Sequence, residues 1–287
     1  MAQLQTRTGL GVFLALSGGL LISIDIPVIR LAGAEPWLVM LARGLGLALV
    51  LGLVLIIAGK RIGAPPNPFD DRQFVEIGIL FGVSSIFFTL AVFNTSTANL
   101  VFILAFNPML AAIFAWALIG ERPDLVTWGT IFFTIIGVAI IVSDGLEGGT
   151  LKGDIYALIT AVFLALSIVR TRQSGKNMSL APAMGGMVTG LFALPIALSN
   201  FSMPEQPAWL LVNVLVLVPL AGFTLSFAPR FIPAPQVAVF FLLETVLAPI
   251  WVWLIFAEIP SNKTLTGGLI VLISIAFHTA WNLRAKN

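Results

Sequence analysis

Three ionisable side chains lie well inside long apolar stretches of the chain: Asp25, Arg43 and Glu244. A charged group at the centre of a helix in a membrane costs about 2.5–3.5 kcal/mol on insertion scales. Such a residue therefore usually faces a cavity or a partner, and it is a functional candidate by default. The chemistry open to these residues is electrostatic. A carboxylate can bind an ammonium group or carry a proton, and a guanidinium can bind a carboxylate.

Asp25 and Arg43 are expected on neighbouring antiparallel helices. Asp25 lies seven residues before the end of the first apolar stretch, and Arg43 lies about seven residues into the second. At a rise of 1.5 Å per residue, both lie about 10 Å below the same membrane surface. One interpretation is a structural ion pair that makes both charges tolerable. Another is that one or both face a cavity and bind the two charges of a zwitterion, and the two interpretations are compatible.

Glu244 lies among aromatic residues near the middle of its apolar stretch. Phe240 is four residues before it and Trp251 seven after it, so all three share one face of a helix. Gln236 adds a polar group one turn before Phe240. Because aromatic faces attract cations and stack with rings, this set suits a ligand that is part cation and part ring. The alternative is a protonated glutamic acid that is hydrogen-bonded between helices.

A second polar face lies in the apolar stretch Ala98–Pro123. Asn99 and Asn107 share that face, with Phe102 beside them, and Pro108 follows directly after Asn107. A proline inside a helix removes a backbone hydrogen bond and kinks the helix. The sequence therefore predicts either a kinked packing helix or a bent, partly polar cavity wall that these three side chains line.

The stretch Ala98–Pro123 recurs 137 positions later as Pro235–Pro260. At this offset Asn107 falls on Glu244. The residues that are identical in the two copies are Leu110, Ala111, Ile113, Trp116, Glu121 and Pro123, which fall on Leu247, Ala248, Ile250, Trp253, Glu258 and Pro260. A recurrence at about half the chain length indicates a duplicated unit. We place the two units at residues 1–145 and 146–287.

The composition requires a membrane to surround these elements. The chain has 287 residues, of which 59% are hydrophobic and 10% are charged, whereas soluble domains carry roughly 25% charged residues. Helices that are hydrophobic all round must sit in a core or a bilayer. The sequence therefore predicts an all-α polytopic membrane protein. It contains no cysteine and one histidine, His278, so we expect neither a metal site nor a cofactor.

Apolar runs of about 20 residues, which is the length that crosses a bilayer, predict ten membrane helices. The expected spans are Gly9–Ala32, Trp37–Ala58, Arg72–Phe93, Ala98–Ile119, Asp124–Ser143, Gly153–Thr171, Leu180–Ser199, Ala208–Ala228, Pro235–Ala257 and Leu265–Leu283. We interpret Gly78-x-x-x-Gly82 and Gly186-x-x-x-Gly190 as contacts where two helices approach closely.

The basic residues are unevenly distributed between the two sides of the expected bundle. Eleven lie on the side of the membrane that holds both termini, three lie on the other side, and Arg43 lies within a span. This bias places the N- and C-termini in the cytoplasm. The outer loops carry the acidic residues Glu35, Asp144, Glu147, Asp154, Glu205 and Glu258.

Each unit holds five expected spans, and an odd number makes the second unit enter the membrane in the opposite direction. The expected fold is a 5+5 inverted-topology repeat around a central cavity. Secondary transporters often have this construction, with the substrate held near the midplane where the repeats meet.

With Asn107-Pro108 followed by Glu121-x-Pro123, the chain resembles the EamA branch of the drug/metabolite transporter superfamily. Within that superfamily it is most similar to bacterial exporters of amino acids, including aromatic ones. The resemblance implies a basket of ten helices around a central cavity, with the fifth and tenth helices at the periphery. The second unit departs from the pattern, because it has Glu244-Thr245 in place of Asn-Pro.

We therefore expect a secondary transporter in the cytoplasmic (inner) membrane that exports amino acids, including aromatic and hydrophobic ones, and related metabolites by alternating access or downhill facilitated flow. Its expected partners are the lipid bilayer and a small-molecule substrate, and we expect a monomer. The alternative is a multidrug exporter of cationic aromatic compounds, coupled to protons. An intramembrane enzyme or a structural subunit is disfavoured, because only Asp25 and His278 would be available, at opposite faces. Nucleotide-binding motifs are absent, and the scattered basic residues do not indicate nucleic-acid binding.

Overall fold

The computed structural model describes residues 2–63, 69–120, 122, 125–148, 150–227 and 234–284. Every regular element in this part of the chain is helical, which confirms the all-α class there. The elements are α1 (Ala2–Ser23), α2 (Asp25–Leu31), α3 (Pro36–Ile62), α4 (Arg72–Val92), α5 (Thr97–Leu104), α6 (Asn107–Ile119), α7 (Leu125–Gly148), α8 (Leu151–Ser174), α9 (Ala181–Ser199), α10 (Pro207–Val212), the π-helix η1 (Asn213–Leu217), α11 (Val218–Phe227), α12 (Ala234–Phe256) and α13 (Asn262–Arg284).

Eight helical segments among the described residues are long and apolar enough to cross a membrane. They are Gly9–Leu31, Pro36–Arg61, Arg72–Val92, Thr97–Ile119, Leu125–Ser143, Leu151–Thr171, Ala181–Ser199 and Pro207–Leu225. The two remaining expected spans coincide with α12 and α13, each 23 residues long. The described side chains of α12 supply the apolar stretch Leu243–Phe256. The count of ten crossings stays a prediction.

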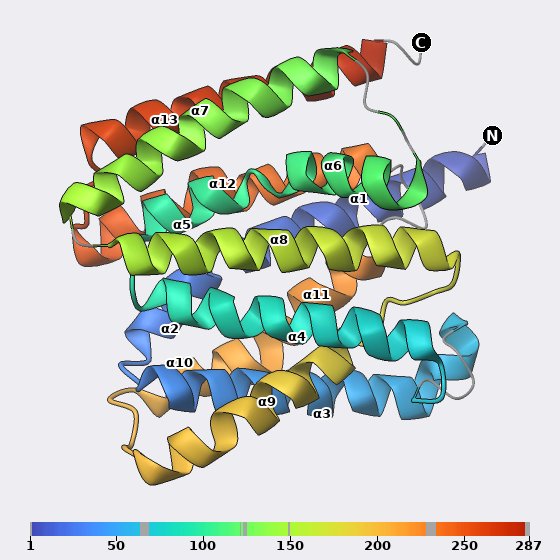
Figure 1. Cartoon of the computed structure of the whole chain (residues 1–287). Coiled ribbons are helices and arrows are strands. Elements are labelled where there is room, and N and C mark those ends of the chain that lie inside the picture. The colour runs from blue at the N-terminus through green and yellow to red at the C-terminus, as the bar shows by residue number, and fades with distance from the viewer. Residues whose placement is uncertain are drawn as a thin grey trace.

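The helices lie side by side in a layered bundle, and α1 begins at the same end at which α13 ends (Figure 1). We call this end the terminal end and the opposite one the loop end. Helices α3 and α9 pack together, as do α4 and α8, and α4 also contacts α9. Helix α13 packs on α7, and the two form one flank of the bundle (Figure 1). This is the peripheral position that the family resemblance implies for the fifth and tenth helices.

Three of the membrane-crossing segments are interrupted about one turn before a proline. The break between α1 and α2, at Ile24, precedes Pro27, and the break between α5 and α6 precedes Pro108. The π-helix η1 precedes Pro219. Proline has no N–H to donate and its ring clashes with the carbonyl one turn earlier, so the helix widens or breaks there. The kink predicted at Asn107-Pro108 is confirmed.

Glycines bring α3, α4 and α9 into backbone contact. A Cβ atom added to Gly44 of α3 would lie 2.4 Å from the backbone nitrogen of Gly190 in α9. A Cβ on Gly186 would lie 2.6 Å from the Gly44 carbonyl oxygen, and one on Gly82 would lie 2.8 Å from the Gly185 carbonyl oxygen. The packing interpretation of the small-residue motifs is therefore confirmed.

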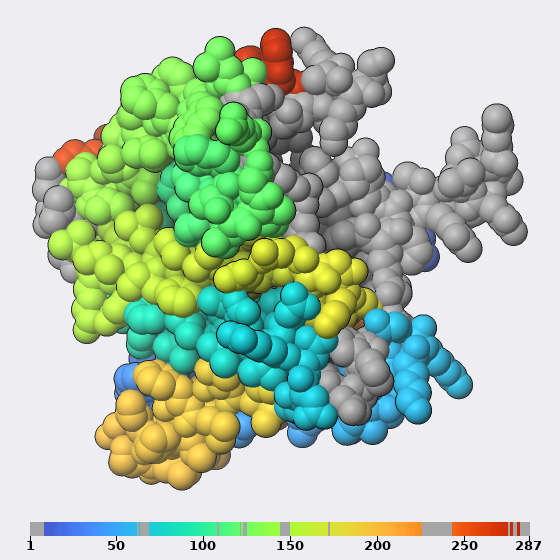
Figure 2. All heavy atoms as spheres, turned by 45° about the vertical axis from the view of Figure 1, so that its right-hand side comes forward, coloured from blue at the N-terminus to red at the C-terminus, as the bar shows by residue number. Residues whose placement is uncertain are grey.

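Ion pairs join α4 to α8 and to the connection after it, at the terminal end. Glu76 accepts from Arg170 at 3.0 Å, and Asp71 accepts from Lys176 at 2.6 Å. Asp71 also caps α4 by accepting from the backbone N–H groups of its first turn. The hydrogen bond from the Lys176 ammonium holds the pKa of the Asp71 carboxyl below its ordinary value. Helices α4 and α8 also lie against each other on the surface of the molecule (Figure 2).

Large apolar side chains cover much of the outside of the bundle. Ile56 is 81% exposed, Phe132 is 61% exposed and Leu254 is 63% exposed. In water this surface would be strongly unfavourable, whereas in a bilayer it contacts lipid. Of the polar side chains that the sequence singled out, Asp25 and Arg43 lie buried inside the bundle, beside the break between α1 and α2.

Candidate functional site

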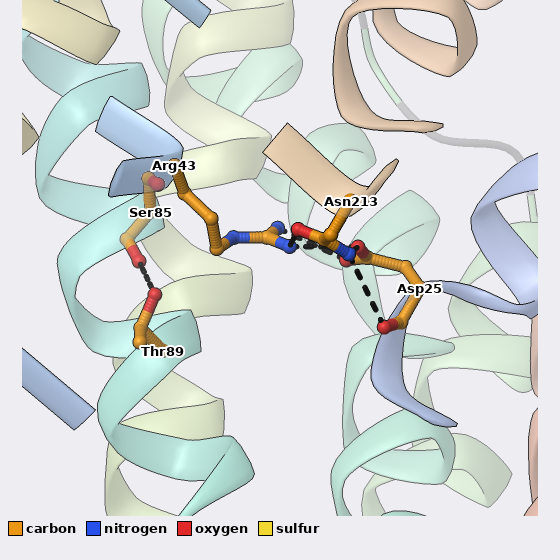
Figure 3. A network of polar contacts seen from close by, with 5 residues as sticks. All are labelled: Asp25, Arg43, Ser85, Thr89 and Asn213. Atoms are coloured by element: carbon orange, nitrogen blue, oxygen red, sulfur yellow. Dashed lines mark hydrogen bonds and ion pairs between the residues drawn. The ribbon is translucent and has the colours of Figure 1, made fainter. Parts of the chain in front are cut away.

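A buried network of charged and amide groups joins α2, α3 and η1. Arg43 donates to both carboxylate oxygens of Asp25, at 2.7 Å to Oδ1 and 2.9 Å to Oδ2. The side chain of Asn213 accepts from Arg43 at 2.7 Å and donates to Asp25 Oδ1 at 2.6 Å. The three residues are between 0% and 8% exposed. Figure 3 shows the guanidinium of Arg43 reaching towards Asn213 and Asp25.

Two helix interruptions place these groups. Asp25 is the first residue of α2, directly after the break at Ile24, so its carboxylate lies at the N-terminal end of that helix. Asn213 is the first residue of η1, where the backbone is wider than an α-helix. Such π-helical turns inside longer helices are frequently found at functional sites. The prolines that follow each interruption therefore account for the position of the site.

Arg43 is held from a second side by α4. Its guanidinium lies over the ring of Phe88, 5.5 Å from the ring centroid, which is a cation–π contact. The neighbouring turn of α4 is closed by a hydrogen bond from the Thr89 hydroxyl to the Ser85 carbonyl, also drawn in Figure 3. The Nε–H of Arg43 is buried and has no hydrogen-bond partner among the described residues. One edge of the guanidinium thus keeps an unused donor.

Helix α12 brings an acid and an indole to the same region. The indole N–H of Trp251 donates to the hydroxyl of Ser23 at 3.3 Å, two residues from Asp25. Glu244 is half-buried two turns before Trp251 and interacts electrostatically with both Asp25 and Arg43. Among the described residues Glu244 has no hydrogen-bond partner. The site therefore combines a neutralised ion pair, a further carboxyl group and a half-buried indole.

Asn99 lies in a different polar cluster, at the loop end. Its amide donates to Asp154 Oδ1 at 3.2 Å and accepts from the Thr264 hydroxyl at 2.6 Å. The Thr95 hydroxyl donates to the same carboxylate. All four residues are buried. The expectation that Asp154 belongs to an outer loop is wrong: it lies in the first turn of α8 and is 0% exposed.

The remaining members of the predicted set have separate surroundings. Asn107 donates to the Ala161 carbonyl at 2.9 Å and so ties α6 to α8. Phe102 is buried against Gly268 of α13 and lines an apolar groove of about 280 Å³ between α5, α12 and α13. Gln236 and Phe240 lie in α12, but their side chains are outside the described residues.

The structure thus brings Asp25, Arg43, Glu244 and Trp251 together, and it places Asn99, Phe102 and Asn107 elsewhere. Sequence reasoning missed Asn213, which completes the network. The sequence carried a signal for it, because an amide followed within two turns by Pro219 is unusual in an apolar stretch. The pattern is similar to Asn107-Pro108, which drew attention for that reason.

Comparison with known families identifies the class of protein. The model of the EamA-like transporter family matches residues 9–143 and again residues 151–280. The chain belongs to this family. The EamA-like chain is therefore a multi-pass membrane protein, and its family consists of transporters.

Individual relatives of this EamA-like transporter agree with the family assignment. Solute carrier family 35 member G1 of Homo sapiens is 28% identical over 230 residues, which cover 72% of this chain. The matched region is 62% of the human protein, so the chain spans less than two thirds of that relative's length. Pseudopaline exporter CntI of Pseudomonas aeruginosa strain UCBPP-PA14 is 24% identical over 214 residues, covering 71% of this chain and 75% of that protein.

The fold also has a counterpart among solved structures. A crystal structure of another protein aligns over 99% of both chains with a TM-score of 0.63 and 20% identity. At this identity the likeness establishes a shared fold alone. The whole of the EamA-like chain, from α1 to α13, is therefore one known arrangement of helices.

Proposed function

We propose that this EamA-like transporter exports zwitterionic amino acids, including aromatic and apolar ones, across the cytoplasmic membrane by alternating access. The observation that carries the proposal is the cluster of the buried residues Asp25, Arg43 and Asn213 with the half-buried Glu244 and Trp251. Burying several ionisable groups in a membrane bundle is costly, and such groups usually mark a substrate or ion pathway. The set also offers groups of both charges and an aromatic surface.

The arrangement suits the three parts of an amino acid. The unused Nε–H edge of Arg43 is a donor for the carboxylate, and the carboxyl group of Glu244 is an acceptor for the ammonium. The half-buried indole of Trp251 offers an apolar face to the side chain. Asn213 and Asp25 keep the guanidinium in place, so that binding requires little rearrangement.

The residues of the site come from both halves of the chain. Asp25 and Arg43 belong to the first family match, whereas Asn213, Glu244 and Trp251 belong to the second. Helix α1 starts at the terminal end, and α8, which opens the second match, starts at the loop end (Figure 1). This opposite direction supports an inverted repeat of two five-helix units, with the substrate held where they meet. The proposal includes ten crossings and cytoplasmic termini.

Counterflow into proteoliposomes tests the substrate class. We expect labelled aromatic and apolar amino acids to exchange, and a labelled quaternary ammonium compound not to exchange. Glu244→Gln removes a charge-assisted hydrogen bond worth about 1.5–3 kcal/mol, so exchange should fall by about 10- to 100-fold. If Glu244→Gln leaves exchange and its pH dependence unchanged, the role of Glu244 is wrong. Absence of exchange with every compound would contradict the substrate proposal.

A second function is favoured by the charge of the site. Asp25 neutralises Arg43 through two hydrogen bonds, so Glu244 is the acid of the set that no counter-ion binds among the described residues. A site with one excess acid attracts cations, as in an exporter of cationic aromatic compounds that is coupled to protons. Exchange of the quaternary ammonium compound without amino-acid exchange would support this alternative. Replacing both charges together, Arg43→Gln with Asp25→Asn, should then preserve exchange, whereas it should abolish exchange of an amino acid.

A further inference from the structure

An ion pair at the loop end joins the last turn of α2 to the segment that follows α12. Arg30, in the last turn of α2, pairs with Glu258, which lies two residues after the end of α12. Arg30 also donates to the Thr95 carbonyl at 3.3 Å. The other oxygen of Glu258 accepts from the backbone N–H of Thr97, at the start of α5, at 3.4 Å. We call Arg30, Glu258 and these two backbone contacts the latch.

The latch rests on a buried, hydrogen-bonded base. Thr95, whose carbonyl binds Arg30, donates its hydroxyl to the buried carboxylate of Asp154 in α8. Asn99 of α5 binds the same carboxylate and also Thr264 of α13. These four residues are at most 7% exposed. The base therefore ties α5 to α8 and α13, while the latch adds α2 and α12.

Water reaches the latch but not its base. The side chain of Arg30 is 21% exposed and that of Glu258 is 32% exposed. An ion pair that water reaches contributes little net stability, because the separated charges are solvated again. The latch can thus open at small cost, whereas opening the buried base would leave a carboxylate without its donors.

A backbone turn at the end of α12 sets the direction in which Glu258 points. Ala257, directly before Glu258, has a φ of +55°, the left-handed conformation that ends a helix and usually selects glycine. This turn ends α12 with a hydrogen bond from the Ala257 N–H to the Trp253 carbonyl at 2.9 Å. It directs the next residue, Glu258, back towards α2.

Opening the latch would separate the helices that hold the site. Arg30 is five residues after Asp25, and Glu258 is seven residues after Trp251. Helices α2 and α12 contact each other, and α12 also packs on α5. In the structure Ser23 and Asp25 are buried, and they lie on the segment α1–α2 whose far end carries Arg30. From this geometry we infer that the Arg30–Glu258 pair is the outer gate of the transport pathway, and that its release opens the site to the outside.

The inference rests on the proposed alternating access but not on the identity of the substrate. The corresponding residue of the first repeat, Glu121, lies outside the described residues. The gate is therefore assigned to the loop end alone, which the charge distribution predicts to be the outer side.

A cysteine-labelling experiment tests the gate without any substrate. The chain contains no cysteine, so Ser23→Cys supplies a single thiol behind the latch. Whole cells are treated with a membrane-impermeant maleimide from the outside. Adding Glu258→Gln should raise the labelling rate by about twofold to fivefold, the factor that corresponds to loss of a partly exposed ion pair. Arg30→Gln should have the same effect, and the exchanged pair Arg30→Glu with Glu258→Arg should restore protection.

The control thiol is Met203→Cys, in the α9–α10 connection, whose native side chain is 73% exposed. Its labelling should not depend on the latch.

In inside-out vesicles the Ser23→Cys thiol should label more slowly when the latch is broken, because opening one side closes the other. Unchanged outside labelling in both latch variants would overturn the inference. So would faster labelling from both sides together, which indicates loosened packing. If amino-acid counterflow fails, the proposed substrate is wrong, whereas the inference about the gate still stands.

Discussion

At the scale of single residues, the buried ion pair of Asp25 and Arg43 depends on a third group. A buried pair is stable only when its remaining donors and acceptors are satisfied. Asn213 does this on one side, because its amide accepts from Arg43 and donates to Asp25 at the same time. Both interpretations of the pair, structural and substrate-binding, are compatible with this geometry. The amide fixes the guanidinium in either case.

Replacing Asn213 should therefore destabilise the protein. Asn213→Leu keeps a similar volume but leaves two hydrogen bonds to charged groups unmade, which costs about 1.5–3 kcal/mol for each such bond. The melting temperature in detergent, followed by tryptophan fluorescence, measures the loss. The control is Asn200→Leu, which changes an exposed asparagine at the end of α9. Equal melting temperatures for the two variants would contradict the role of Asn213.

At the scale of elements, the bundle combines rigid and interrupted helices. Helices α3, α4 and α9 pack closely through glycines, with backbone atoms in contact. The segments that carry Asp25 and Asn213 are broken or widened before Pro27 and Pro219. Interrupted helices expose backbone groups and are common at the binding sites of transporters. The rigid helices form the frame, and the interrupted ones form the site.

Two glycines of α3 allow this division to be tested. Gly44→Ala places a Cβ atom 2.4 Å from the backbone of α9, whereas a Cβ on Gly52 meets nothing within 4 Å. Overpacking of this kind costs about 1–3 kcal/mol, so Gly44→Ala should lower the melting temperature. Gly52→Ala should be neutral or stabilising, because alanine favours a helix by about 0.5–1 kcal/mol over glycine. If the two variants have the same melting temperature, the α3–α9 contact is not closely packed.

At the scale of the whole molecule, the distribution of charge predicts the orientation in the membrane. The bias of basic residues towards the terminal end places that end in the cytoplasm. The ion pairs of α4 with α8 and the following connection lie at this end, and the latch lies at the other (Figure 1). The direction of transport through the site depends on this orientation.

Two exposed positions report the orientation directly. Asp70→Cys lies before α4 at the terminal end, and Met203→Cys lies between α9 and α10 at the loop end. In intact cells an impermeant maleimide should label Met203→Cys, and it should label Asp70→Cys only after the membrane is permeabilised. The reverse pattern would overturn the cytoplasmic placement of the termini, and with it the assignment of the latch to the outer side.

The sequence by itself determined the class of the protein, the doubled unit and the location of most ionisable groups of the site. These properties follow from local composition and from spacing along one helix, which a chain carries before it folds. The kink at Asn107-Pro108 was predictable for the same reason. Asp25 and Arg43 were paired correctly because they lie on consecutive helices that a short turn keeps adjacent.

The tertiary structure decided which distant residues meet. Asn213 is 170 residues from Arg43, and Glu258 is 228 residues from Arg30. Such contacts depend on how far each helix is rotated and shifted against its neighbours, and the hydrophobic pattern of an all-round apolar helix leaves both free. For the same reason Asn99 joined Asp154 in the base of the latch rather than the charged site. Contacts of α12 with α1, α2 and α5 placed the acid of α12 near the ion pair of α2 and α3.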